Sequence, residues 1–117
     1  MLINQDRSGY VDPGYSSKFS ERVAKIFNSK IVKKKFSRDK NGDYNGLLSV
    51  VFNMKDGRKI AETVDGDFDL ALLLADCPDT LEDDLFSKVG SKSEEDITDQ
   101  EILDASRWKS IIVTPVS

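Results

Sequence analysis

Apolar and polar residues alternate most regularly between residues 47 and 54. The even-numbered side chains of this segment would lie on one side of an extended chain, and all are apolar: Leu48, Val50, Phe52 and Met54. A period of two is the pattern of a strand with one buried face. The segment therefore predicts a β-strand whose even-numbered side chains pack against the core.

A second strand is expected over residues 58–64, after a turn at residues 55–57. Two registers are open for this hairpin. A two-residue loop would place Phe52 opposite Ala61, whereas a three-residue loop would place Phe52 opposite Ile60. The second register sets apolar side chains against apolar side chains more consistently, and we prefer it.

Helical spacing of apolar residues occurs in two segments. The first runs from about residue 18 to 28, and its apolar face consists of Phe19, Val23, Ile26 and Phe27. The second is expected to begin after Asp79, because Asp79 and Glu82 have capping-box spacing. It ends before Gly90, a typical helix terminator, and its face consists of Leu81, Leu85, Phe86 and Val89. A shorter helix is expected from Thr98 to about Ser106, because Thr98 and Glu101 have the spacing of a capping box.

Residues 67–75 fit two secondary structures. A strand is favoured by the Asp65-Gly66 turn signal and by alternating apolar residues at Phe68, Leu70, Leu72 and Leu74. Alternatively, Asp67 or Asp69 would cap a short buried helix that ends before Cys77. We lean towards the strand and leave the helix open.

Further strands are expected at residues 31–37 and 111–114, with a long loop at residues 38–46. Pro115 favours an edge position for the last strand, because proline cannot donate a backbone hydrogen bond.

These elements predict an α+β domain that covers residues 1–117. We expect an antiparallel sheet of hairpin-linked strands, with an N-terminal helix and one or two C-terminal helices packed on one face. Residues 1–15 are expected to form an entering strand or an irregular arm, and residues 91–97 a polar linker within the domain.

The charge of the chain is strongly segregated along its length. Residues 1–60 hold 13 Lys and Arg against 6 Asp and Glu, a net charge of +7. Residues 61–117 hold 4 Lys and Arg against 15 Asp and Glu, a net charge of −11, so that the chain carries −4 overall. An acidic half with this excess predicts a surface that attracts a basic partner, although a solvated face would have the same composition.

The chain has no histidine and a single cysteine, which restricts its chemistry. Zinc sites built from histidine or several cysteines are excluded, and the chain contains no phosphate-binding loop, Cys-x-x-Cys pair or nucleophile elbow. Cys77 lacks a histidine base, so we interpret it as a small buried side chain rather than a nucleophile. We therefore expect no catalytic residues and no cofactor.

Two aspartate-rich segments have the composition of metal sites. Residues 39–43 have the early spacing of a calcium loop, but Tyr44 and Val50 stand where that loop needs Gly and Glu, so we reject it. If residues 65–69 form a strand, Asp65, Asp67 and Asp69 lie on one face, and their three carboxylates could bind a hard cation. Turn chemistry explains these aspartates more simply, and we expect no metal site.

The leading functional hypothesis is a non-catalytic protein that binds a basic protein partner, such as a nuclease toxin, through its acidic C-terminal half. The size and charge of the chain are typical of bacterial immunity proteins and phage inhibitors, although no motif identifies such a family. The candidate contact residues are Glu82, Asp83, Asp84, Glu94, Glu95, Asp96 and Trp108. Trp108, the single tryptophan, would anchor such an interface or else close the core.

The alternative hypothesis is a nucleic-acid-binding module. Its contacts to a phosphate backbone would come from Lys33, Lys34, Lys35 and Arg38, with Phe36 or Tyr44 stacking on bases. The same lysines would also protect an exposed edge strand, and the overall negative charge opposes approach to a polyanion. We therefore expect nucleic acid less than a protein partner.

The sequence also predicts where the protein acts. No apolar run is long enough to span a membrane, and the first residues lack the apolar segment of a secretion signal. A lone cysteine agrees with a reducing compartment. We expect a cytoplasmic protein without a membrane partner, and the oligomeric state stays open.

Overall fold

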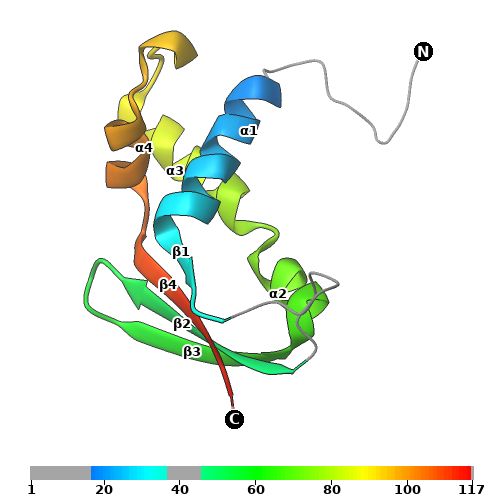
Figure 1. Cartoon of the computed structure of the whole chain (residues 1–117). Coiled ribbons are helices and arrows are strands. Elements are labelled where there is room, and N and C mark those ends of the chain that lie inside the picture. Colours follow the sequence, from blue (N-terminus) through cyan, green and yellow to red (C-terminus); the bar gives the residue numbers. More distant parts are fainter. Residues whose placement is uncertain (1–16, 37–45, 117) are drawn as a thin grey trace, which may run out of the picture.

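A four-stranded sheet forms the base of the molecule. The computed structural model describes residues 17–36 and 46–116. Its strands are β1 (Val32–Lys34), β2 (Leu47–Met54), β3 (Lys59–Asp65) and β4 (Trp108–Pro115). Their spatial order is β1-β4-β2-β3, so β1 and β3 are the edges (Figure 1). The predicted arm at residues 1–15 and most of the predicted loop at residues 38–46 lie outside the described residues.

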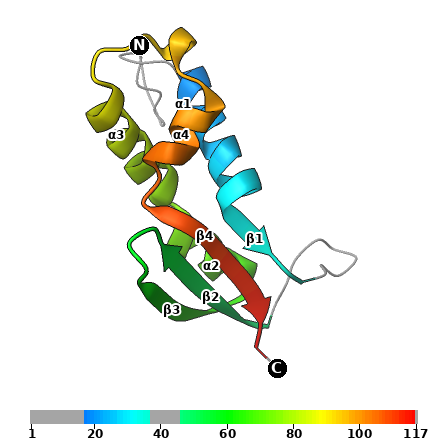
Figure 2. The same ribbon diagram turned by 90° about the vertical axis from the view of Figure 1, so that its left-hand side faces the viewer.

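The sheet is mixed, which corrects the predicted antiparallel arrangement. β2 is antiparallel to β3 and to β4, but β1 is parallel to β4. The last strand of the chain inserts between β1 and β2 (Figure 2), so these two consecutive strands do not pair. The edge position predicted from Pro115 is also wrong. Val113 is the last β4 residue that pairs with β1, and Pro115 ends β4 two residues later. No β1 residue therefore lies opposite Pro115, which has no N–H to donate.

The hairpin of β2 and β3 has the preferred register. Phe52 lies opposite Ile60 and Leu48 lies opposite Val64. Leu48, Val50 and Phe52 are buried, which confirms that the alternating pattern marks the core face of β2. β3 is an edge strand with little covering it, so Ile60 remains 43% exposed.

Helices cover the core face of the sheet. They are α1 (Ser17–Ile26), which continues into a π-helical turn, η1 (Phe27–Ile31), followed by α2 (Gly66–Leu74), α3 (Cys77–Val89), the 3₁₀ turn η2 (Glu94–Asp96) and α4 (Asp99–Ala105). η2 falls inside the predicted polar linker, and Ile97 after it is buried. No helix in the described part of the chain is both long enough and apolar enough to cross a lipid bilayer.

The ends of α3 and α4 follow from local sequence. α3 begins at Cys77, so the predicted cap at Asp79 is wrong and Asp79 lies inside the helix; Pro78 is tolerated in the first helical turn. It ends at Gly90, whose φ of 67° lies in the region that favours glycine. In α4, the Glu101 amide donates to Thr98 Oγ1 (3.1 Å) and the Thr98 amide donates to Glu101 Oε1 (2.9 Å), which confirms the predicted capping box.

Residues 66–74 form helix α2, so the favoured strand prediction is wrong and the helical alternative is right. Leu70 and Leu74 are one helical turn apart, and both are buried against the core. Apolar residues at every second position satisfy a strand, but every second member of that set is four residues further along and also lies on one face of a helix. Gly66, with a φ of 88°, turns the chain from β3 directly into α2, so no loop separates the two elements.

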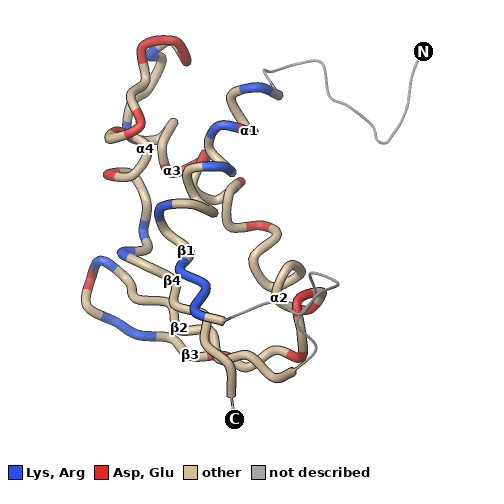
Figure 3. The backbone as a smooth tube through the Cα atoms, in the orientation of Figure 1, with Lys and Arg blue, Asp and Glu red and all other residues tan. Residues whose placement is uncertain are grey.

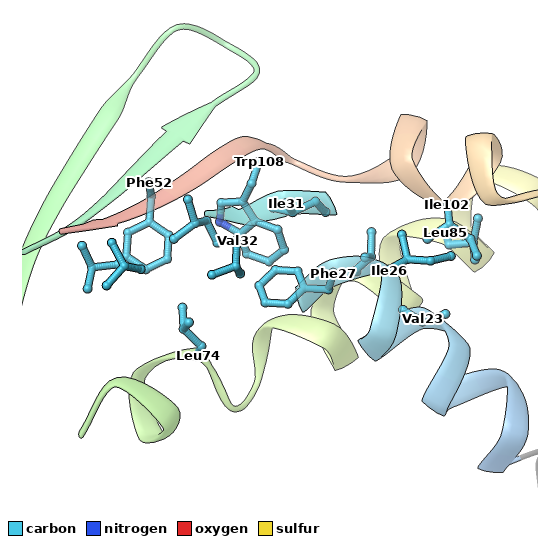
Figure 4. Close-up of a cluster of buried hydrophobic side chains, with 14 of the residues drawn as sticks. Val23, Ile26, Phe27, Ile31, Val32, Phe52, Leu74, Leu85, Ile102 and Trp108 are labelled. Carbon is cyan, nitrogen blue, oxygen red and sulfur yellow. The ribbon is translucent and has the colours of Figure 1, made fainter. Parts of the chain in front are cut away.

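The hydrophobic core joins the helices to the sheet (Figure 4). At its centre, the rings of Phe27 and Trp108 meet edge to face with 5.5 Å between their centroids. Phe27 is completely buried, and Trp108 is 7% exposed. Trp108 is therefore a core residue, which corrects its prediction as a partner-binding residue. The sequence leaves both roles open because tryptophan is common in cores and in interfaces.

Candidate partner-binding surface

An acidic groove lies between α3, η2 and α1. Its volume is about 560 Å³, and its lining consists of Ser20, Asp79, Glu82, Asp83, Phe86 and Glu94. The α3 side chains share this groove because their positions along the helix differ by three, four and seven residues. We call the surface formed by Asp79, Glu82, Asp83, Glu94, Glu95 and Asp96 the acidic end.

Glu82 is the most perturbed carboxylate of the acidic end. Partial burial, followed by repulsion from Asp79, Glu94 and Asp83, raises the pKa of Glu82, and the hydrogen bond from Ser20 opposes this shift. That bond joins Ser20 Oγ to Glu82 Oε1 over 3.0 Å. A positive charge placed in the groove would relieve the repulsion among the carboxylates, so the groove favours a cationic side chain.

Other carboxylates of the acidic half are neutralised inside the molecule. Arg107 donates two hydrogen bonds of 2.9 Å to the carboxylate of Asp84, which raises the pKa of Arg107. Arg22 pairs with Asp99. Asp84 was predicted to contact a partner, but its carboxylate is already held by Arg107, so we remove it from the candidate site.

Glu101 is neutralised in the same way as Asp84. Lys92 Nζ lies 2.8 Å from Glu101 Oε2, and this contact together with the Thr98 amide lowers the pKa of Glu101. By contrast, Asp83, Glu94, Glu95 and Asp96 take part in no ion pair among the residues that the structure describes. The structure thus divides the predicted acidic surface into neutralised residues and free ones.

The structure adds Asp79 and Ser20 to the site residues predicted from the sequence. The sequence pattern assigns Asp79 only to a helix cap, and Ser20 lies 62 residues before Glu82 in the chain. The spacing of Asp79, Glu82 and Asp83 places them on one helical face, so the sequence could have indicated Asp79 as a site residue. No local pattern indicates that α1 would bring Ser20 to this face.

Positive and negative charges gather in different regions (Figure 3). Acidic residues concentrate on η2 and α3, whereas lysines follow α1 and β1. Lys33, Lys34 and Lys35 are all exposed, and β1 is an edge strand, so these lysines lie where edge protection requires them. Phe36 is half-buried and packs against the core, which weakens its predicted stacking on bases. Arg38 and Tyr44 lie outside the described residues.

The aspartates considered for a metal do not share one face. Asp65 ends β3, while Asp67 and Asp69 lie on α2 about 200° apart around the helix axis. Within residues 17–36 and 46–116, no group of three or more acidic or cysteine side chains is placed to hold a metal ion. The rejected calcium loop at residues 39–43 lies outside this part of the chain.

Cys77 occupies a half-buried position against the core. Burial and the nearby Asp76 raise the pKa of its thiol, and Arg107 opposes this shift. A raised pKa leaves little thiolate at neutral pH, which agrees with a packing role rather than a nucleophilic one.

Comparison with known proteins does not identify a relative. No protein-family model, no curated protein and no solved structure matches the chain.

Proposed function

We propose that this chain is a non-catalytic protein that binds and neutralises a basic protein partner, such as a nuclease toxin, through its acidic end. The observation that carries the proposal is the groove around Glu82, where four carboxylates from α3 and η2 converge. Burial and repulsion from the neighbouring carboxylates raise the pKa of Glu82. The negative charge of this groove is therefore not balanced by positive side chains of the described residues. A lysine or arginine of the partner would supply the positive charge.

The rim of the groove supports fast capture of such a partner. Glu95 and Asp96 are exposed on η2, and Asp83 is exposed on α3. Exposed charges of one sign steer an oppositely charged protein towards its binding site, and their effect weakens with added salt. A nuclease must carry positive charge to hold nucleic acid, so an acidic protein can occupy the same surface.

Charge reversal with a matched control tests this proposal. The test variant carries Asp83→Lys, Glu94→Lys and Glu95→Lys at the acidic end. The control carries Glu21→Lys, Glu62→Lys and Asp104→Lys, three exposed carboxylates outside it. Both variants change the net charge equally, so a general charge effect would alter both alike.

The wild-type chain and both variants are used to capture proteins from the native host lysate, and the captured protein is assayed kinetically. We expect a basic protein that the wild type and the control retain. The test variant should associate with it at least about tenfold more slowly at low salt. Retention of the same protein by the test variant at an unchanged rate would contradict the proposal.

Binding of nucleic acid is the second candidate, and one observation favours it. Six exposed lysines lie on α1, η1 and β1 and directly after β1: Lys18, Lys25, Lys30, Lys33, Lys34 and Lys35. Filter binding of single- and double-stranded DNA and RNA at 20 mM and 200 mM salt would separate the candidates. Affinity that falls steeply with salt and is lost in a Lys33→Glu/Lys35→Glu variant supports nucleic-acid binding, whereas no affinity at the lower salt excludes it.

A further inference from the structure

Helix α2 exposes an apolar ridge. The side chain of Phe68 is 75% exposed and that of Leu72, one helical turn later, is 60% exposed. Ala71 and Ala75 lie beside them and are also exposed. Leu70 and Leu74 are buried on the opposite side, so α2 has apolar side chains both towards the core and towards solvent. An exposed pair of large apolar side chains on such a helix is typical of a protein-binding surface.

A groove runs along one flank of this ridge. Its volume is about 570 Å³, and its apolar lining includes Leu70, Leu74 and Pro78. Lys34 of β1 and Asp67 of α2 both line it, so its charged residues are of opposite sign. The groove therefore suits an apolar side chain of a binding partner.

Exposed aspartates lie on α2 and next to both of its ends. Asp65 ends β3 directly before the helix, Asp69 lies in its first turn, and Asp76 follows its last residue by two positions; all three are exposed. None of the three takes part in an ion pair among the described residues. A segment that lies across the ridge would bring its own charged side chains close to these carboxylates.

We propose that α2 is a docking site for a partner segment that places a large apolar side chain in the groove and lysine or arginine side chains beside Asp65, Asp69 and Asp76. The carboxylates select the positive charge, and the ridge contributes most of the buried apolar area. This groove and the groove of the acidic end share no lining residue, and α2 lies far from η2 in the molecule (Figure 1). The docking site therefore goes beyond the proposed function and does not depend on it.

Peptide selection tests the proposal without knowledge of the natural partner. A library of randomised 12-residue peptides displayed on phage is selected on the full chain, with the Phe68→Ser/Leu72→Ser variant as the counter-selection. We expect enriched peptides that combine Leu, Phe, Met or Trp with Lys or Arg. A synthetic copy of an enriched peptide should lose at least about tenfold in affinity for this variant, since exposed anchors dominate such interfaces.

Two further variants separate the parts of the site. Asp65→Asn/Asp69→Asn/Asp76→Asn keeps the ridge and removes the three negative charges around it, so affinity for the same peptide should fall roughly threefold to tenfold and its salt dependence should flatten. Ala71→Arg places a positive charge on the ridge and should also weaken binding. Because all of these side chains are exposed, circular dichroism and thermal melting should show that each variant folds.

Three results would overturn the proposal. The first is enrichment of peptides that bind the Phe68→Ser/Leu72→Ser variant equally well. The second is an acidic consensus, which would assign recognition to Lys34. The third is self-association of the wild type in sedimentation that the ridge variant loses, since the ridge would then be covered by a second copy. The charge-reversed variant of the acidic end should bind the peptide normally, so failure of one site leaves the other testable.

Discussion

Phe27 and Phe68 are residues of the same type in opposite environments. Phe27 is completely buried against Trp108, whereas Phe68 is 75% exposed on α2. Phe27→Ala should lower the free energy of unfolding by about 3–5 kcal/mol, because it leaves a cavity in a packed core. Phe68→Ala should change it by no more than about 0.5 kcal/mol. Urea denaturation followed by circular dichroism measures both, and equal losses would contradict this assignment of the core.

The pKa of Glu82 makes stability depend on pH in a definite direction. Because this pKa is raised above its usual 4.5, the folded chain binds the proton more tightly than the unfolded chain does. The stabilisation is complete below pH 4.5 and is lost as the pH rises through the raised pKa. Glu82→Gln should therefore be more stable than the wild type at pH 7, by less than about 1 kcal/mol, and the difference should shrink towards pH 4.

Urea unfolding between pH 4 and pH 8 measures this difference. Ser20 Oγ can still donate to the amide oxygen of the glutamine, so the substitution removes the charge and keeps a hydrogen-bond acceptor. Glu62→Gln, on the exposed edge strand β3, is the matched control and should show no comparable effect. A stability gap that grows as the pH falls would contradict the interpretation.

At the level of elements, the capping box of α4 is a local device with a measurable contribution. Thr98 and Glu101 satisfy each other's backbone amides at the start of a helix of seven residues. Thr98→Ala should lower the free energy of unfolding by about 1 kcal/mol. Ser87→Ala, at an exposed interior position of α3, should be neutral or slightly stabilising. Thermal unfolding of the two variants side by side checks this prediction, and an equal effect would show that Thr98 does not act as a cap.

The element that sequence patterns misassigned is also the one proposed as a docking site. In α2, Leu70 and Leu74 are buried in the core, whereas Phe68 and Leu72 are mostly exposed to solvent. A pattern of alternating apolar residues cannot distinguish side chains that the core requires from those that a partner requires. The disagreement between pattern and structure therefore coincides with the two most exposed large apolar side chains in the described residues.

For the whole molecule, the distribution of charge bears on solubility as well as on binding. β1 is a short edge strand with two exposed lysines, Lys33 and Lys34, and the exposed Lys35 directly follows it. Lys33→Thr/Lys35→Thr should increase the rate of aggregation severalfold, because an uncharged edge can pair with another chain. Lys25→Thr/Lys30→Thr removes the same charge from α1 and η1 and should aggregate much less. Light scattering during incubation compares the two variants, and equal rates would indicate that net charge alone keeps the chain soluble.

Much of the local structure was predictable, because the signals that specify it lie within a few residues of one another. Three examples are the period of two in β2, the spacing of the apolar face of α1, and the cap at Thr98. Each depends only on residues that are close together in the sequence. The register of the hairpin followed from matching Phe52 with Ile60 across a short turn. For the acidic end, the sequence indicated Glu82, Asp83, Glu94, Glu95 and Asp96 as charged positions, but it did not indicate that several of them border one groove.

By itself, the sequence determined the α+β class, the main helices, the central hairpin and the separation of charge along the chain, since these depend on composition and local periodicity. Only the tertiary structure decided that β4 enters between β1 and β2, that residues 66–74 are helical, and which carboxylates remain free. Arg22 neutralises Asp99 across 77 residues of chain. Such long-range pairings depend on how the whole chain buries its apolar surface, and no short segment contains that information.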